Sequence, residues 1–537
     1  SDQTLRYNGS FVNEELSSGI SLYGMYRNRD SYDANGDGFT ELTRIENNTF
    51  GGQAFYKPGK RSKISINFNA IREYRRGGDQ LDLAPHFTDI TEETDHNTVI
   101  GGITYDLFDK SRRGKLSVYL STQGTRRNSY YGGLGGGRTA ADSTLARNAY
   151  GVTSDLAAVG GVQYSRYFPN EDVLVVGTEG QYNRVEDRIT GYNRLVDQWV
   201  GIGGIFAQYE WKPSKRFKAL FGARYDHTLV DGLYQVDNIR RSVDQASTGV
   251  LSPRLTLMYH LHENLQFRGG YARGFRAPQA FNEDLHISSV GGEPQFVILS
   301  ENLEKELSDA FTASLNYSQN YGRTEFKALV EGFHTRINNP FTTVSTGAVL
   351  PNGSILEEVR NGEGASVSGV NFEFSFSPSE DYRLQLGGTA QNSRYEEPQV
   401  LYEPTATESN QEVVAVEEFI RTPRLYGYLA SFWQISHSIG IDLTGTFTGP
   451  MIVPRVINQD GRIELRNSES FLDANLKLIY DWHLGEDFEI ELSAGVRNIL
   501  NSFQDDFDTG PTRDSDYVYG PLNPRTYFFG ITLGSIH

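Results

Sequence analysis

Residues 471–482 read FLDANLKLIYDW. Apolar and polar side chains alternate along this stretch. One face carries Leu472, Ala474, Leu476, Leu478, Tyr480 and Trp482, and the other carries Asp473, Asn475, Lys477 and Asp481. A period of two places successive side chains on opposite faces of a β-strand. The stretch therefore predicts a strand with one face in an apolar environment and the other in water.

The same alternation recurs from one end of the chain to the other, most clearly at 371–376, 383–386, 439–448, 488–497 and 525–537. Many of these segments run about 11 to 16 residues, whereas strands of soluble proteins typically have about 5 to 6. Strands of that length suit a tilted crossing of a bilayer with extensions beyond it. A soluble all-β sandwich or propeller would also alternate, and it is the weaker interpretation.

The connectors between these segments are predicted to alternate strictly between short and long. The short ones are 57–60, 169–172, 212–215, 378–381 and 483–487, and the long ones are 76–95, 128–154, 274–305, 397–417 and 502–519. Outer-membrane barrels have short periplasmic turns on one rim and long extracellular loops on the other. Aromatic residues also stand at segment ends, where amphipathic rings favour the membrane interface, as at Tyr209, Trp211, Trp433, Tyr480 and Trp482.

Composition excludes several other classes of protein. The chain has 537 residues, 38% of them hydrophobic, and no run of about 18 apolar residues that could cross a membrane as a helix. The absence of cysteine removes disulfides and thiolate sites, and a net charge of -18 argues against nucleic acid as a partner. No nucleophile elbow, HExxH or phosphate loop is present, so we do not expect an enzyme.

The fold predicted is therefore all-β, a transmembrane antiparallel barrel spanning residues 1–537. About 21 strands can be counted, whereas plugged transporters typically have about 22. If the first turn, near 15–18, is periplasmic, the strand around 5–12 runs inward from the extracellular side, and another strand should precede it. The last strand, RTYFFGITLGSIH at 525–537, is expected to close the barrel by pairing with the first strand, because an open edge is not tolerated in hydrocarbon.

Several stretches resemble TonB-dependent outer-membrane receptors, and together they cover essentially the whole chain. They are DANGDGFTEL at 33–42, YARGFRAP at 271–278, APQAFNEDLH at 277–286, ENLEKELSDAFTASLNY at 301–317, NGEGASVSGVNFEFSFSP at 361–378, RTPRLYGYLA at 421–430, and GVRNILNSFQDDFD through GPLNPRTYFFGITLG at 495–534. The first and third of these are similar to versions found in Bacteroidetes receptors. No stretch resembles the plug domain that fills the barrel in this family. This agrees with the inference that a first strand is absent, and we expect both the plug and that strand to precede residue 1.

The resemblance implies a receptor in the outer membrane of a Gram-negative bacterium that actively takes up a scarce ligand such as a ferric siderophore, haem or cobalamin. It implies outer-membrane lipid and lipopolysaccharide as surroundings, the TonB-ExbB-ExbD energy system as a partner reached through the absent plug, and a surface lipoprotein or other envelope partner as a further option. A passive porin-like channel and a barrel scaffold in a larger outer-membrane complex are the alternatives.

A loop between the first strands has the spacing of a calcium-binding loop. Oxygen ligands fall at Asp33, Asn35, Asp37 and Glu41, although the twelfth position is Arg44 where a bidentate acid is expected. A structural Ca²⁺ site and a turn rich in Asp and Asn both fit this pattern.

Two other loops contain candidate ligand-binding residues, and the resemblance places one of them in the ligand vestibule. Basic and aromatic side chains there could stack on a planar ligand or a catecholate, and a histidine could ligate haem. The candidates are Arg126, Arg127, Tyr130 and Tyr131 in one loop and Arg276, Gln279, Glu283, Asp284 and His286 in the other. A solvated loop with no ligand is the alternative for each residue taken singly.

Overall fold

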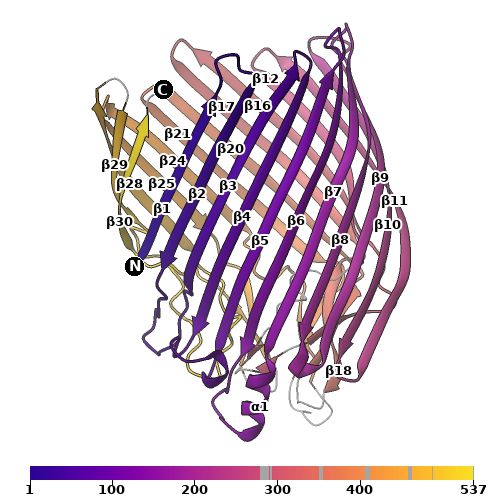
Figure 1. Ribbon diagram of the computed structural model, residues 1–537, viewed down its shortest axis with the longest axis vertical. Helices are drawn as coiled ribbons and strands as arrows, with labels where there is room; N and C mark the ends of the chain where they lie inside the picture. Colours follow the sequence, from indigo (N-terminus) through magenta and orange to yellow (C-terminus); the bar gives the residue numbers. More distant parts are fainter. Residues whose placement is uncertain are drawn as a thin grey trace.

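The computed structural model describes residues 1–278, 289–290, 293–294, 296–349, 355–404, 412–457, 462–485 and 488–535. A single antiparallel sheet of 21 strands dominates it and curves around a central lumen (Figure 1). No helix within these residues has the length and apolar character to cross a bilayer.

Each strand of the sheet pairs with the sheet strand that follows it in the chain, so the order in space is the order in sequence. The strands are β1 (Asp2–Val12), β2 (Ser18–Arg29), β3 (Arg44–Gly59), β4 (Ser62–Gly78), β5 (Thr91–Phe108), β6 (Gly114–Gly132), β7 (Tyr150–Tyr167), β8 (Val173–Ile189), β9 (Arg194–Trp211), β10 (Phe217–Val236), β11 (Ile239–His262), β12 (Leu265–Arg276), β16 (Glu306–Tyr321), β17 (Thr324–Asn338), β20 (Gly364–Ser379), β21 (Tyr382–Tyr395), β24 (Leu425–Ser436), β25 (Ile439–Thr448), β28 (Phe471–Leu484), β29 (Phe488–Arg497) and β30 (Thr526–Ser535).

The remaining elements belong to the long connectors. They are η1 (Pro85–Phe87), α1 (Ala140–Asn148), η2 (Thr190–Tyr192), β13 (Ser289–Val290), β14 (Glu293–Pro294), β15 (Phe296–Leu299), β18 (Phe341–Val349), β19 (Ile355–Asn361), β22 (Gln399–Tyr402), β23 (Val414–Val416), β26 (Ile452–Val456) and β27 (Ile463–Asn467). They gather at one rim, which we call the loop rim, while the opposite rim holds only tight turns (Figure 1).

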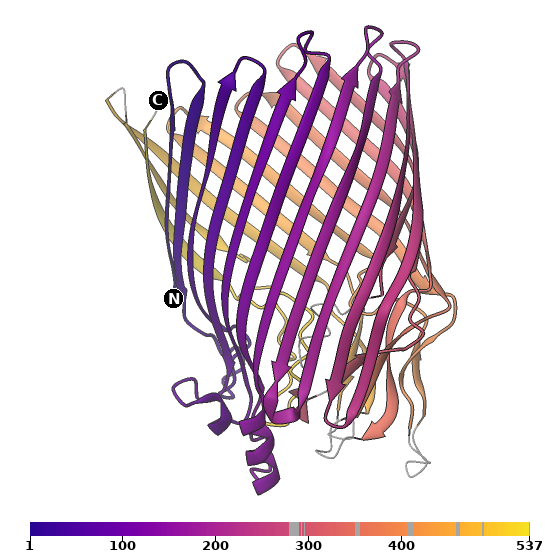
Figure 2. The same cartoon turned by 45° about the vertical axis from the view of Figure 1, so that its right-hand side comes forward.

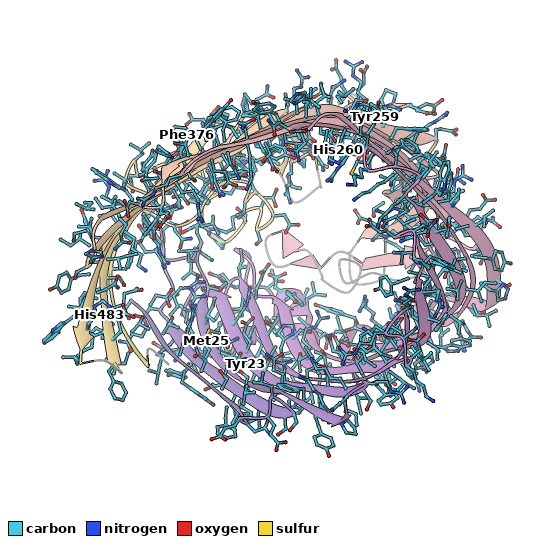
Figure 3. All side chains as sticks on the ribbon, turned by 90° about the horizontal axis from the view of Figure 1, so that it is seen from above. Tyr23, Met25, Tyr259, His260, Phe376 and His483 are labelled. Carbon is cyan, nitrogen blue, oxygen red and sulfur yellow. The ribbon has the colours of Figure 1, made fainter. Side chains whose placement is uncertain are left out.

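The alternation read from the sequence divides each strand between two environments. On β6, Val118 and Leu120 are 40% and 53% exposed on the outer face, while Lys115 pairs inside the ring with Asp106 of β5 at 3.0 Å. Figure 3 labels a neighbouring pair on β11, with Tyr259 toward the outside and His260 toward the lumen. Exposed apolar side chains on the outer face of a barrel form the band that contacts lipid. The transmembrane barrel predicted from the sequence is confirmed.

The expectation of strict alternation between short and long connectors is wrong at two places on the loop rim. β8 and β9 are joined by residues 190–193, and β10 and β11 by residues 237–238. Here the strands continue as paired hairpins far past the apolar band, with Val236 opposite Ile239 at the tip. The segment predicted as a long loop at 128–154 is shorter for the same reason, since β6 ends at Gly132 and β7 begins at Tyr150.

The predicted pairing of the last strand with the first is not present among the described residues. β1 and β30 are the two edges of the sheet, and every residue of β1 is exposed. They face each other across a seam, near which the N-terminus lies (Figure 2).

A charge placed on the lipid face should destabilise the barrel. Leu120 lies near the middle of the outer apolar stretch of β6, so Leu120→Arg should cost about 2–4 kcal/mol in unfolding free energy. Urea unfolding of the protein refolded into vesicles, followed by tryptophan fluorescence, measures the loss.

The matched control is Ser121→Arg, one residue along the same strand on the lumen face, where water solvates the charge. Equal losses for the two variants would contradict the assignment of the two faces.

Candidate functional site at the barrel mouth

A small sheet built from two separate loops lies inside the ring of barrel strands at the loop rim (Figure 3). β15, from the β12–β16 connector, pairs in parallel with β19, from the β17–β20 connector. β19 in turn pairs antiparallel with β18. We call this three-stranded unit the inner sheet.

Apolar contacts hold the inner sheet against the barrel wall. Leu299 of β15 and Val359 of β19 are 4% and 3% exposed and pack with Val196 and Tyr234 of β9 and β10. Burying apolar surface of this kind contributes roughly 25 cal/mol per Å². The inner sheet is therefore docked on one side of the mouth by its own side chains.

A polar pocket of about 390 Å³, which we call the inner-wall pocket, opens on the lumen face of β4, β5 and β6. It is lined by Thr43, Glu73, Arg75, Glu92, Thr94, His96, Arg127 and Tyr131. The period of two explains why these residues line one pocket, since Glu92, Thr94 and His96 are alternate residues of β5. His96 lies between Glu73 of β4 and Arg127 of β6 in the strand register.

Two arginines enter the inner-wall pocket, and each is held by different polar contacts. The Nε of Arg75 donates to Glu73 Oε1 at 2.6 Å. The Nη2 of Arg127 donates to Thr153 Oγ1 at 2.9 Å and lies 3.7 Å from Asp187 Oδ1. Asp187 is itself buried and paired with buried Arg194. These contacts orient both guanidinium groups, which can then receive an anionic or planar group by paired hydrogen bonds or stacking.

Carboxylates from three elements converge beside the pocket. Glu92 lies on the part of β5 beyond the apolar band, Glu357 lies on the inner sheet, and Asp516 lies in the β29–β30 connector. Burial, and then the charge of Asp516, raise the pKa of Glu92 to about 7. The same two causes raise the pKa of Glu357 above its usual range.

The four candidates at 126–131 lie on β6 rather than in a loop, and alternation separates them. Arg127 and Tyr131 face the lumen and line the inner-wall pocket. Arg126 is exposed on the outer face. Tyr130, also on the outer face, is 1% exposed because it packs against Tyr150, with ring centroids 4.8 Å apart.

The candidates of the second loop are only partly placed. Arg276 is the last residue of β12, and its guanidinium lies 5.6 Å from the centroid of the Phe341 ring at the edge of the inner sheet. Gln279, Glu283, Asp284 and His286 lie outside the described residues.

The calcium-like loop forms a different set of contacts. Asp33 Oδ1 and Oδ2 accept the backbone N–H groups of Gly36 and Gly38. Asp37 pairs with Arg513, whose other terminal nitrogen lies 3.1 Å from Glu41 Oε1. Arg513 thus supplies a positive charge at two of the predicted ligands, and the described residues contain no cluster of three or more His, Asp or Glu arranged for a metal ion. Asn35 Oδ1 accepts a turn hydrogen bond from Asp37 N.

The residues that sequence reasoning missed are Arg75, Glu92, Thr94, His96 and Glu357. The first four could have been found by extending the alternation of 73–75 and 91–108, which places these residues on the face that points into the lumen. Glu357 could not, because nothing local indicates that residues 355–361 fold back into the barrel.

The family described as "TonB dependent receptor-like, beta-barrel" matches residues 6–526. The "Iron-regulated outer membrane virulence protein" of Vibrio cholerae is 27% identical over 183 residues, which is 33% of this chain and 24% of that protein. The chain thus matches about a quarter of the length of the curated relatives.

Solved structures of similar fold cover nearly all of the chain. The siderophore receptor PirA from Acinetobacter baumannii superposes with a TM-score of 0.71 at 13% identity, covering 100% of this chain and 78% of that one. A mutant of the ferric enterobactin receptor PfeA from Pseudomonas aeruginosa gives 0.70 at 16% identity, with the same coverages. The FrpB iron transporter from Neisseria meningitidis gives 0.70 at 12% identity, covering 98% and 79%.

The converging carboxyls make the docking of the inner sheet dependent on pH. Because the folded pKa of Glu92 and of Glu357 is raised, the docked state is favoured at low pH, and this stability is lost as the pH rises from the usual carboxyl range through the raised pKa values, which is about 7 for Glu92. The double variant Glu92→Gln, Glu357→Gln should therefore melt a few degrees higher than the parent at pH 8 and equally at pH 4.5, in a calorimetric scan.

Glu397→Gln, at an exposed carboxyl in another connector, is the control and should change neither melting temperature. A parent protein whose mouth is more stable at pH 8 than at pH 5 would contradict the assignment.

Proposed function

The chain belongs to the TonB-dependent receptor β-barrel family, and from this premise we propose that it is an outer-membrane receptor for active uptake of a ferric siderophore. The family and its structural neighbours are receptors and transporters, not enzymes. They indicate an outer-membrane protein of a Gram-negative bacterium.

The observation that supports an anionic iron chelate is the inner-wall pocket. Arg75 and Arg127 bring two guanidinium groups to one lumenal pocket, and Tyr131 adds an aromatic ring beside them. A ferric catecholate complex combines negative charge with flat aromatic rings, which guanidinium groups bind by hydrogen bonding and stacking. Glu92 opposes an anion least when it is protonated, and its raised pKa keeps a proton available near neutral pH. Haem and cobalamin are the other ligand classes to be tested.

Energy coupling, a plug domain and one further barrel strand belong to the same proposal. The full-length receptor would carry a plug domain and one further strand ahead of Ser1, and the plug would reach the TonB-ExbB-ExbD system. Support comes from the two unpaired edges, β1 and β30, since a membrane barrel leaves no open edge in hydrocarbon. Mass and N-terminal sequence of the mature protein test this point, and a mature protein that begins at Ser1 would contradict it.

Removal of the two pocket arginines should weaken binding of the ligand. Each guanidinium contributes charge-assisted hydrogen bonds of about 1.5–3 kcal/mol, so Arg75→Ala with Arg127→Ala should raise the Kd for a ferric tris-catecholate at least tenfold. Isothermal titration of the purified full-length receptor, with hemin and cyanocobalamin titrated in parallel, measures the change.

The control is Arg44→Ala with Arg188→Ala, which removes two exposed guanidinium groups that pair with Glu46 and Glu186 away from the lumen. Tighter binding of hemin or cyanocobalamin than of any ferric siderophore would contradict the proposed ligand class and assign the receptor to haem or cobalamin. Uptake that continues after the membrane is de-energised would favour the porin alternative.

A further inference from the structure

A row of hydrogen-bond donors crosses the outer face of four neighbouring strands. Asn48 of β3 lies opposite Arg72 of β4, Arg72 lies opposite Asn97 of β5, and Asn97 lies opposite Arg126 of β6. All four are on the face that carries the lipid-exposed residues of these strands. The four positions of the row carry no carboxylate, and the nearest one, Asp95 of β5, accepts a hydrogen bond from the Asn97 amide at 3.5 Å.

A second row, of apolar residues, lies one step nearer the turn rim on the same face. Phe50, Ala70, Val99 and Gly124 are opposite one another in that order, so large and small side chains alternate. Ala70 therefore lies directly below Arg72, and Gly124 lies directly below Arg126. Phe50 and Val99 are 46% and 52% exposed, and a Cβ atom at Gly124 would meet nothing within 4 Å.

The alternation of large and small residues produces a groove. A hollow of about 470 Å³ lies around Ala70, with Leu5, Tyr7, Tyr26, Phe50 and Val99 among its apolar lining and Asn48, Arg72 and Asn97 at its upper end. The groove therefore runs from the apolar band up to the donor row. Its shape and composition suit a hydrocarbon chain that ends in a polar group.

The two arginines of the donor row are accessible. The side chain of Arg72 is 66% exposed, and its contact with Asp95 is long, at 3.6 Å. Arg126 is exposed and forms no ion pair with any residue that the structure describes. Arg72 and Arg126 are separated by two strand intervals, about 10 Å.

We propose that Arg72, Arg126 and the amides of Asn48 and Asn97 bind the phosphates of an outer-leaflet glycolipid, with one of its acyl chains in the groove below Arg72. Guanidinium groups recognise phosphate by paired, charge-assisted hydrogen bonds. The apolar row marks the level at which hydrocarbon ends, so the donor row lies at the depth of lipid headgroups. The spacing of the arginines suits a headgroup with two phosphates better than one with a single phosphate. Ligands of the lumen cannot reach this face.

Native mass spectrometry of the full-length receptor, exchanged into detergent with added hexa-acylated bisphosphoryl lipid A, tests the site. Arg72→Ala with Arg126→Ala should reduce the fraction carrying the lipid at least fivefold, and Arg72→Lys with Arg126→Lys should retain most of it. Monophosphoryl lipid A should bind the parent more weakly than the bisphosphoryl form. Heat-modifiable migration on gels confirms that each variant is folded.

The matched control is Arg75→Ala with Arg127→Ala, which removes the same charge from the same two strands on the lumen face. It should leave lipid binding within twofold of the parent. Three results would overturn the proposal. They are an equal loss of lipid binding in the Arg75, Arg127 variant, undiminished binding in the Arg72, Arg126 alanine variant, and equal binding of dephosphorylated lipid A by the parent. Stronger retention of phosphatidylglycerol than of lipid A would assign the groove to a phospholipid and overturn it as well.

Discussion

Backbone hydrogen bonding in hydrocarbon is the constraint on which this structure depends. No water is available in the bilayer core, so each peptide group must pair with a neighbouring strand. Within the sheet that the structure describes, the ladder of consecutive antiparallel strands meets this demand except at the outer edges of β1 and β30. At the mouth, ion pairs connect the two loops nearest the seam. Arg513 of the β29–β30 connector pairs with Asp37 and Glu41 of the β2–β3 connector. This buried pairing links the two sides of the seam where the strands do not.

The same ladder gives each strand two independent surfaces, and one residue of register separates them. Arg126 and Arg127 are neighbours in sequence, yet one faces the membrane side and the other lines the inner-wall pocket. If residues 126–131 are assigned to a loop, the sequence predicts both as ligand-binding residues. The pattern at 114–124 already determines the faces, since Val118 and Leu120 must face lipid. Extending that register to the end of β6 separates the two arginines without any structure.

The fold could be predicted because alternation is local, and the site could not because its parts are not. Leu472 to Trp482 indicate a strand from their own spacing. In contrast, Glu92, Glu357 and Asp516 come together only because two connectors enter the lumen. β15 and β19 are short, and their pairing joins segments more than fifty residues apart. Loop boundaries were misplaced for a related reason: hairpins such as β10–β11 extend because strands satisfy each other's hydrogen bonds, whether or not a membrane surrounds them.

Opposing forces act on the inner sheet. Leu299 and Val359 bury apolar surface against the wall and favour docking. The negative charge of Asp516 acts on both Glu357 and Glu92 and opposes docking when these carboxyls are ionised. Burial makes this repulsion stronger, because a low dielectric screens charge poorly. Any cation, proton or positively charged group that enters the mouth therefore stabilises the docked sheet, while an anion stabilises it only if the guanidinium groups of Arg75 and Arg127 balance its charge. The position of the inner sheet and the charge of the lumen are thus coupled through the same wall of β4, β5 and β6.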